Sequence, residues 1–514
     1  MTEPQQPLSR RALRDARSAG RSVVPAAPGA TGTSADSATA SANGFVAFVG
    51  RHPRALLTTA LSVVFLLMAT GALLAGVSVG SATAVEPAPI VTPTPTAEPR
   101  TQPDAVAAPG RLRTCTIDSL ARDERLTTLF GSVINASTGE LLFDRQASTP
   151  ARTASVLKVL TAAVALSALG PDYRLTTRVV AGTTPGSIVL VGGGDATLSR
   201  LPAGQESVYP GAPKLADLAA QTVAAYAAAN PDAPGITEVV LDSTYWSSAD
   251  KWDSSWARIE QTIGYHSEVT ALQVDGDRQD PRLATSPRST DPVARAGAAF
   301  VAALASAGNP AGQPTWSVGT AVSTVVLGQV QSQPVKTLIN QMLPSSDNTI
   351  AEMLARVSSL AVGLDGSAAS LTQAFTDVLN VYGVPTTGIS IRDGSGLSHL
   401  NAVSARYVAE LFVVINGGGQ NLEIITGALP VAGVSGSLAG RFTGANAVAR
   451  GAVFAKTGWL ATSYSLAGIV RAADGSVLAF SFYAIREGIG SNARAALDTL
   501  TTGVFMCGDN LSNN

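Results

Sequence analysis

Apolar residues recur at every second position in several short runs near the two ends of the chain's C-terminal part. Residues 129–146 form two such runs around Thr138–Gly139, a pattern typical of a β-hairpin. Residues 452–460 predict another strand, and residues 463–485 predict two strands around the turn residues Asp474–Gly475. The pattern therefore predicts that strands from both ends of this part pair in one antiparallel sheet.

Helices are expected between and after these strands. The apolar segment Ser155–Leu169 predicts one helix, and residues 491–505 predict a closing helix. Residues 176–319 contain apolar runs and turn residues with few long amphipathic patterns, so we expect an inserted, strand-rich subdomain there. The predicted fold class is α+β: an antiparallel sheet flanked by helices, formed by residues 111–175 and 320–514 and interrupted by the insertion.

One segment is apolar enough to cross a membrane. Ala55–Val79 has 25 residues without a charge, and Arg51 and Arg54 precede it on the side expected to stay in the cytoplasm. We therefore expect a single-pass anchor with the rest of the chain outside the cytoplasm. The alternative is a signal peptide cleaved near Ala82–Ala84, which would release a secreted protein.

The segments on either side of this span differ from a folded domain. Residues 1–54 carry seven Arg against three acidic residues and read as a disordered basic tail. Residues 80–110 contain seven prolines, typical of a stiff linker. The whole chain has a formal charge of −2, which gives no reason to expect nucleic acid as a partner.

The chain has two cysteines, Cys115 and Cys507, near the two ends of the predicted domain. Outside the cytoplasm such a pair favours a disulfide that ties the start of the domain to its last helix. Two unrelated buried thiols are the alternative.

The candidate chemistry begins with a lysine on an apolar helix. Lys158 follows Ser155 by three residues, so both side chains lie on one helix face. A serine hydroxyl needs a base to become a good nucleophile, and a lysine whose pKa is lowered can serve. The same S-x-x-K spacing recurs at Ser248 and Lys251, so the spacing alone does not identify a site.

Two further motifs follow in a fixed order. Ser346-Asp347-Asn348 precedes an amphipathic helix, and Lys456-Thr457-Gly458 lies on the strand predicted for residues 452–460. The order S-x-x-K, S-D-N, K-T-G is the motif set of penicillin-recognising serine enzymes. With these motifs the chain resembles the class C low-molecular-mass penicillin-binding proteins, the D-alanyl-D-alanine carboxypeptidases/endopeptidases. The resemblance extends to 190–198, 393–401 and 429–442, and covers about residues 115–505.

The resemblance implies a catalytic role for five side chains. Ser155 would attack the carbonyl of a terminal D-Ala-D-Ala bond and form an acyl-enzyme, with Lys158 as general base. Ser346 would relay a proton toward the leaving amine, and Asn348 would hold Lys158 and the acyl chain. Lys456 would supply positive potential near Ser346.

The same resemblance implies how the substrate is bound. Thr457 would hydrogen-bond the terminal carboxylate, and Gly458 would let the strand backbone approach the substrate. The backbone N–H groups of Ser155 and Trp459 would form the oxyanion hole. Trp459 departs from the small or hydroxylated residue expected there, which bears on substrate fit.

The expected function is a membrane-tethered serine D,D-carboxypeptidase that acts on peptidoglycan peptides and is inhibited covalently by β-lactams. D,D-endopeptidase activity on the same peptides is a second option. One alternative is a β-lactamase, which needs a second base for fast deacylation; another is a catalytically silent wall-binding protein on the same fold. The three histidines are not clustered, so neither a metal site nor a cofactor is expected.

Overall fold

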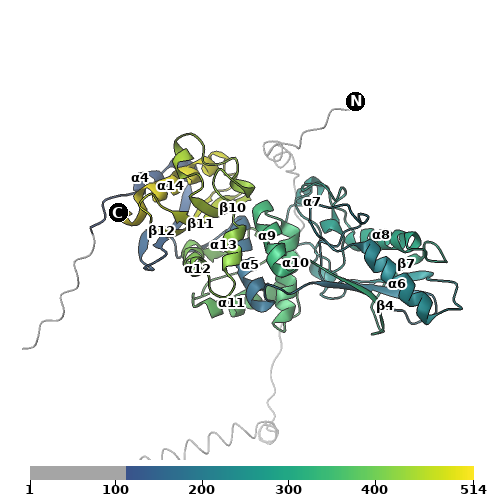
Figure 1. Ribbon diagram of the computed structural model, residues 1–514. Coiled ribbons are helices and arrows are strands. Elements are labelled where there is room, and N and C mark those ends of the chain that lie inside the picture. The colour runs from purple at the N-terminus through teal and green to yellow at the C-terminus, as the bar shows by residue number, and fades with distance from the viewer. Residues whose placement is uncertain (1–111, 514) are drawn as a thin grey trace, which may run out of the picture. The chain divides into compact units, whose positions relative to one another are not determined.

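The computed structural model describes residues 112–513 (Figure 1). Its main sheet has five antiparallel strands in the order β10-β11-β12-β1-β2. The strands are β1 (Thr128–Asn135), β2 (Leu141–Arg145), β10 (Val453–Leu460), β11 (Ser463–Arg471) and β12 (Val477–Ile485). β1 pairs with β12 from Thr128 opposite Ile485 to Asn135 opposite Leu478, so both ends of this part of the chain meet in one sheet, as predicted.

Both faces of this sheet are covered by helices. The closing helix α14 (Asn492–Cys507) packs on one face together with α4 (Asp118–Ala121), and α12 (Ala405–Gly417) packs on the other. β11 and β12 are buried along nearly their whole length, because each face contributes to a separate apolar core. A short pair, β3 (Pro150–Ala151) with β9 (Val403–Ser404), adjoins the segment that leads into the first long helix.

The helical part of the domain is built around α5 (Leu157–Ala168), whose residues 157–166 are all buried. It packs against α9 (Val335–Ser345), α10 (Asn348–Ala361), α11 (Leu371–Leu379) and α13 (Glu423–Ala428). Lys158 lies in the first turn of this buried helix. A charged side chain in such a place must have strong local partners or lose its proton.

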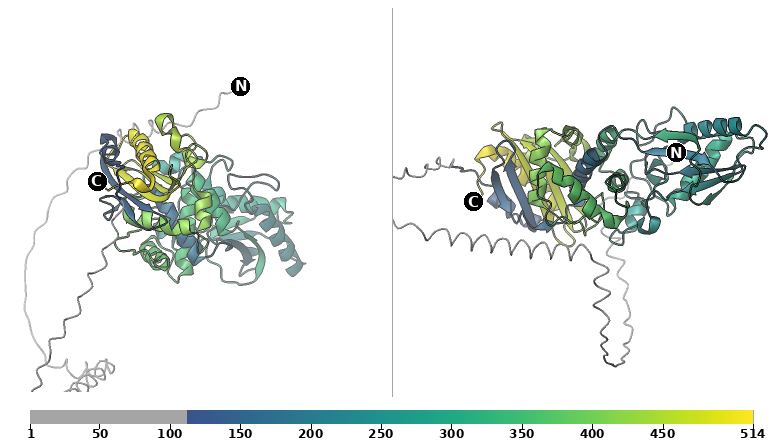
Figure 2. Two further views of the ribbon diagram at one scale, coloured as in Figure 1. Left: turned by 60° about the vertical axis from the view of Figure 1, so that its left-hand side comes forward. Right: turned by 90° about the horizontal axis from the view of Figure 1, so that it is seen from below.

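The insertion contains a second five-stranded sheet in the order β7-β6-β5-β4-β8. Figure 2 shows the insertion in teal. Its strands are β4 (Thr176–Ala181), β5 (Ser187–Val191), β6 (Glu238–Asp242), β7 (Thr315–Val318) and β8 (Val326–Gln331), and its helices are α6 (Leu215–Ala229), α7 (Ile259–Ile263) and α8 (Pro292–Ser306). Since β8 pairs with β4, the insertion extends to Gln331, beyond the predicted end at residue 319.

The insertion also holds two helices of 15 residues, α6 and α8, where few long helices were expected. Both are rich in alanine, so the contrast between their buried and exposed faces is weak. Alanine has the highest helix propensity, however, so the alanine content of these two segments indicated helices where the hydrophobic pattern did not.

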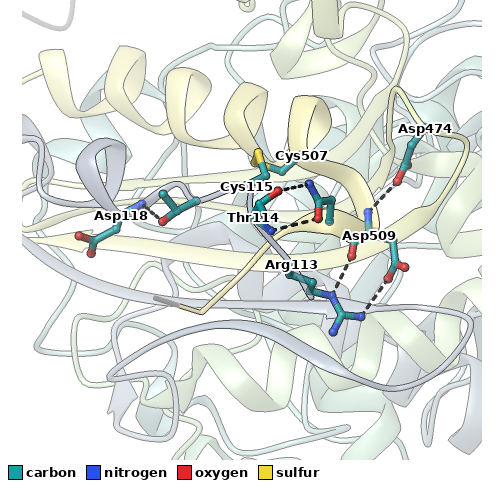
Figure 3. Close-up of a disulfide and its surroundings, with 9 residues drawn as sticks. Arg113, Thr114, Cys115, Asp118, Asp474, Cys507 and Asp509 are labelled. Atoms are coloured by element: carbon teal, nitrogen blue, oxygen red, sulfur yellow. Dashed lines mark hydrogen bonds and ion pairs between the residues drawn. A yellow bond between two sulfur atoms is a disulfide. The ribbon is translucent and has the colours of Figure 1, made fainter. Parts of the chain in front are cut away.

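A disulfide joins Cys115 to Cys507, the last residue of α14 (Figure 3). Next to it, Ser512 N–H donates to the Cys115 carbonyl at 2.7 Å, and the Arg113 guanidinium donates to the Asp509 carbonyl at 2.8 Å. The first and last described segments of the domain are therefore held together by covalent and hydrogen bonds.

The predicted tail (1–54), membrane span (55–79) and linker (80–110) lie outside the described residues. Within residues 112–513, no helix is both long and apolar enough to cross a bilayer.

Candidate active site

Ser155 and Lys158 lie where a short 3₁₀ turn, Ala154–Val156, leads into α5. The Lys158 Nζ is 3.0 Å from the Ser155 Oγ. Ala154, directly before the serine, has a left-handed backbone with φ of 48°, an uncommon conformation for a residue with a side chain. Ser155 is half-buried and Lys158 fully buried, so the hydroxyl faces the outside of the site and the amine its inside.

Two other oxygen atoms accept hydrogen bonds from Lys158. The Asn348 Oδ1 lies 2.7 Å and the Ser395 carbonyl 2.6 Å from its Nζ. Burial lowers the pKa of Lys158 to about 8, although nearby Asp393, Glu352 and Asp347 act in the opposite direction. An appreciable share of this amine is therefore unprotonated near neutral pH, as a general base requires.

Ser346 and Lys456 form a second hydroxyl–amine pair. Ser346 ends α9 in a left-handed conformation, and its Oγ accepts from the Lys456 Nζ at 2.9 Å. The same amine donates to the Thr457 carbonyl at 2.9 Å. Burial, and then the charge of Lys158, lower the pKa of Lys456 well below its usual range.

The three residues predicted to bind substrate follow one another on β10. The Thr457 Oγ1 lies 2.7 Å from the hydroxyl of Ser437, in the loop before β10. A Cβ at Gly458 would lie 2.8 Å from the Thr153 carbonyl, so glycine lets β10 approach the segment that carries Ser155. This close contact is within the protein, and the predicted approach of the Gly458 backbone to substrate remains a prediction. Trp459 packs against the apolar core between the main sheet and α14. Its ring lies beside that of Tyr464, with the centroids 6.5 Å apart.

Residues 114–288 and 283–504 match the model of the D-Ala-D-Ala carboxypeptidase 3 (S13) family. The chain belongs to this family. The family and the fold class predicted from the sequence are thereby confirmed, and the enzyme is a serine-type D-Ala-D-Ala carboxypeptidase. The matches favour this function over the β-lactamase and the silent wall-binding protein.

Several relatives support the assignment. The chain is 35% identical to carboxypeptidase DacB of Mycolicibacterium smegmatis over 458 residues, which cover 87% of this chain and 95% of that protein. It is 34% identical to a carboxypeptidase of Mycobacterium tuberculosis over 403 residues, 77% of this chain and 84% of the relative. The crystal structure of penicillin binding protein 4 from Haemophilus influenzae superposes with a TM-score of 0.61 at 20% identity, covers 76% and 99% of the two chains, and shows the shared fold.

The S13 site also contains side chains that the motifs did not indicate. Glu352, one turn into α10, accepts hydrogen bonds from the backbone N–H groups of Gly394 and Ser395. Asp393 accepts from the N–H groups of Gly396 and Ser398 and so fixes the same loop. A glutamate at a buried position of an amphipathic helix was the available signal for Glu352.

The insertion contributes to the S-D-N motif directly. Arg278 forms an ion pair of 2.8 Å with Asp347, and the Tyr209 hydroxyl donates to the same carboxylate at 3.0 Å. Burial alone would raise the pKa of Asp347, but Arg278 and Arg288 lower it to about 2. Neither Arg278 nor Tyr209 carried a sequence signal, because no motif marks which residue of an insertion will face the site.

The second S-x-x-K sequence has a different environment. Lys251 is partly exposed and forms an ion pair of 2.7 Å with Glu268. The Lys251 amine is therefore engaged by a carboxylate, whereas the Lys158 amine contacts the hydroxyl of Ser155.

His266 lies in an aromatic environment. It is buried between Trp252 and Trp256, with the Trp256 ring centroid at 4.4 Å, and burial lowers its pKa to about 3. Within residues 112–513, no group of three or more His, Cys, Asp or Glu side chains could hold a metal ion.

Proposed function

We propose that Ser155 is the nucleophile and Lys158 the general base of this carboxypeptidase. The observation that carries the proposal is the 3.0 Å contact between the Ser155 hydroxyl and an amine whose pKa burial lowers to about 8. Lys158 takes the hydroxyl proton while Ser155 Oγ bonds to the carbonyl carbon of the terminal peptide bond. The C–N bond then breaks, D-Ala leaves with a proton relayed through Ser346, and water hydrolyses the acyl-enzyme.

The remaining predicted residues bind and polarise the substrate in this proposal. Thr457 donates to the terminal carboxylate, whose negative charge favours the protonated form of Lys456 nearby. The backbone N–H groups of Ser155 and Trp459 stabilise the oxyanion, a pair whose members are each worth ~3 kcal/mol in comparable enzymes. Asn348 keeps the Lys158 amine directed at Ser155, which its 2.7 Å hydrogen bond supports.

The proposed substrates are the D-Ala-D-Ala ends of peptidoglycan stem peptides, and β-lactams are proposed as covalent inhibitors that acylate Ser155. The apolar span and the basic residues before it support an anchor in the cell membrane, with the enzyme outside the cytoplasm. Fractionation of cells that express the full-length chain tests the anchor. A mature protein recovered in the medium and beginning near residue 85 would instead show that the segment is a cleaved signal peptide.

Covalent labelling tests the nucleophile. The full-length protein should take up a fluorescent penicillin, and Ser155→Ala should abolish the label because no other hydroxyl is activated by Lys158. Ser248→Ala is the matched control, since it removes the serine of the other S-x-x-K sequence and should label normally. Loss of the label in Ser248→Ala with retention in Ser155→Ala would reverse the assignment.

The lifetime of the label separates this function from that of a β-lactamase. We expect the bound penicillin to be lost slowly, because fast deacylation needs a second base that activates water. Glu352 is a buried carboxylate near Lys158, but both of its oxygens already accept backbone N–H groups, so it is not available for this role. Turnover of penicillin faster than that of a D-Ala-D-Ala peptide would favour the β-lactamase.

A further inference from the structure

A buried carboxylate lies close to the Lys158 amine and acts on its charge. Glu352 is fully buried on α10, and its Oε1 and Oε2 accept the N–H groups of Ser395 and Gly394 at 2.8 and 3.1 Å. The Ser395 carbonyl in turn accepts from the Lys158 Nζ at 2.6 Å. Glu352 is thus connected to the proposed base through a single peptide unit.

Contacts from two helices, α5 and α10, hold the loop that carries the Ser395 carbonyl in position. The Thr161 hydroxyl of α5 donates to the Gly394 carbonyl at 2.6 Å, while Glu352 of α10 holds the N–H group of the same residue. A Cβ at Gly394 would lie 2.7 Å from the Ala351 carbonyl, so only glycine lets the loop pack this closely on α10. The loop is fixed from both helices, and Glu352 provides two of its contacts.

We propose that Glu352 is a positioning residue for Lys158: it fixes the Ser395 carbonyl that accepts from the amine, and its negative charge favours the protonated amine that forms when Ser155 loses its proton. This inference rests on the proposed roles of Ser155 and Lys158. Both carboxylate oxygens accept N–H groups, and hydrogen bonds donated to a carboxylate favour its ionised form.

Other charged groups around the amine also act on the pKa of Lys158, and they determine how far this pKa changes when the Glu352 charge is removed. Asp393 and Asp347 also raise the pKa of Lys158, whereas burial lowers it. Lys456 and His266 lie near enough to Lys158 that its charge lowers their pKa values. Burial and then Asp393 raise the pKa of Glu352, and Arg356, one turn along α10, opposes the rise. Loss of the Glu352 charge should therefore lower the pKa of Lys158 without removing all of its anionic neighbours.

The test is the pH dependence of acylation of the full-length protein by a fluorescent penicillin, measured from pH 6 to 10. The amide of Glu352→Gln cannot accept both N–H groups, so the plateau rate should fall by about tenfold or more. The loss of charge should also move the rise in rate about one unit to lower pH. A structural role alone would reduce the rate and leave the pH of the rise unchanged.

Two variants complete the design. Glu352→Asp keeps the charge but is one methylene shorter, so it should keep the wild-type pH profile with a reduced rate. Glu487→Gln, at an exposed site after β12, should behave as wild type. If Glu352→Gln does not fold by circular dichroism, Glu352→Asp decides: a wild-type rate, or a shifted profile, would overturn the proposal.

The outcomes also separate this inference from the proposed function. If wild-type protein is not acylated, the proposed function fails. If wild type is acylated and Glu352→Gln has the same rate or the same pH profile, only the role of Glu352 is wrong.

Discussion

At the scale of single residues, the Lys158 amine is shielded from water and has three oxygen atoms as hydrogen-bond acceptors. Three acceptors suit the protonated amine, which has three N–H groups, whereas burial suits the neutral amine. The opposing effects leave its pKa at about 8, within reach of physiological pH. The amine is thus able to accept the Ser155 proton and later release it.

This balance predicts the pH dependence of acylation. The base acts in its neutral form, so the rate should rise with pH through about 8 and level off above it. At pH 7 the rate should be about one tenth of the plateau, because one unit below its pKa about a tenth of the amine is neutral.

The sequence predicted which catalytic side chains lie near one another. Motif order linked Ser155, Lys158, Ser346, Asn348 and Lys456. The structure places them as two hydroxyl–amine pairs, with Asn348 hydrogen-bonded to the Lys158 amine. It could not predict the third acceptor of Lys158, because the Ser395 carbonyl is a backbone group, and backbone roles leave no residue-type signature. The catalytic and binding roles of these residues remain predictions.

At the scale of elements, the start of α10 joins the insertion to the S-D-N motif. Asp347 caps this helix through its bond of 3.0 Å to the Ile350 N–H group, and Arg278 of the insertion pairs with the same carboxylate. The insertion therefore helps to place Ser346 and Asn348 on either side of Asp347. It is part of the structure of the site as well as an addition to the fold.

Removal of this ion pair should weaken both stability and catalysis. Arg278→Met leaves the Asp347 charge buried without its main partner, which should cost about 3–5 kcal/mol of unfolding free energy. Acylation by penicillin should also slow, since Asp347 adjoins two site residues. Denaturant unfolding and labelling rates measure the two effects. Arg282→Met, at an exposed position of the same segment, is the control, and wild-type stability in Arg278→Met would contradict the argument.

Elements with a clear alternation of apolar and polar positions were predictable. The hairpins β1–β2 and β11–β12 lie at the expected turns, because alternation and turn residues are both local signals. The partner of β4 was not predictable, since β8 begins 145 positions further on and its pairing depends on the assembled sheet. The predicted boundary at residue 319 missed Gln331 for this reason.

At the scale of the whole described domain, its first and last segments are held together in three ways. β1 pairs with β12, Cys115 is bonded to Cys507, and the segment around Cys115 pairs with residues 510–512. This closure completes the sheet that carries the K-T-G motif. The stability of β10 should therefore depend on contacts far from the site.

The disulfide should stabilise the domain strongly, because it joins residues 392 positions apart and so restricts the unfolded chain. The double variant Cys115→Ser/Cys507→Ser should lose ~2–5 kcal/mol of unfolding free energy and unfold at a lower temperature. Scanning calorimetry of the variant beside oxidised wild type measures the loss. An unchanged unfolding temperature would mean that the strand pairing and hydrogen bonds alone close the domain.

The most direct test of the central claim, that a buried neutral Lys158 activates Ser155, is the acylation rate of wild-type protein by penicillin as a function of pH. A neutral Lys158 base should give a single rise in rate centred near pH 8, and Ser155→Ala should take up no label at any pH. A rate that is constant from pH 6 to 10, or that falls as the amine loses its proton, would contradict it.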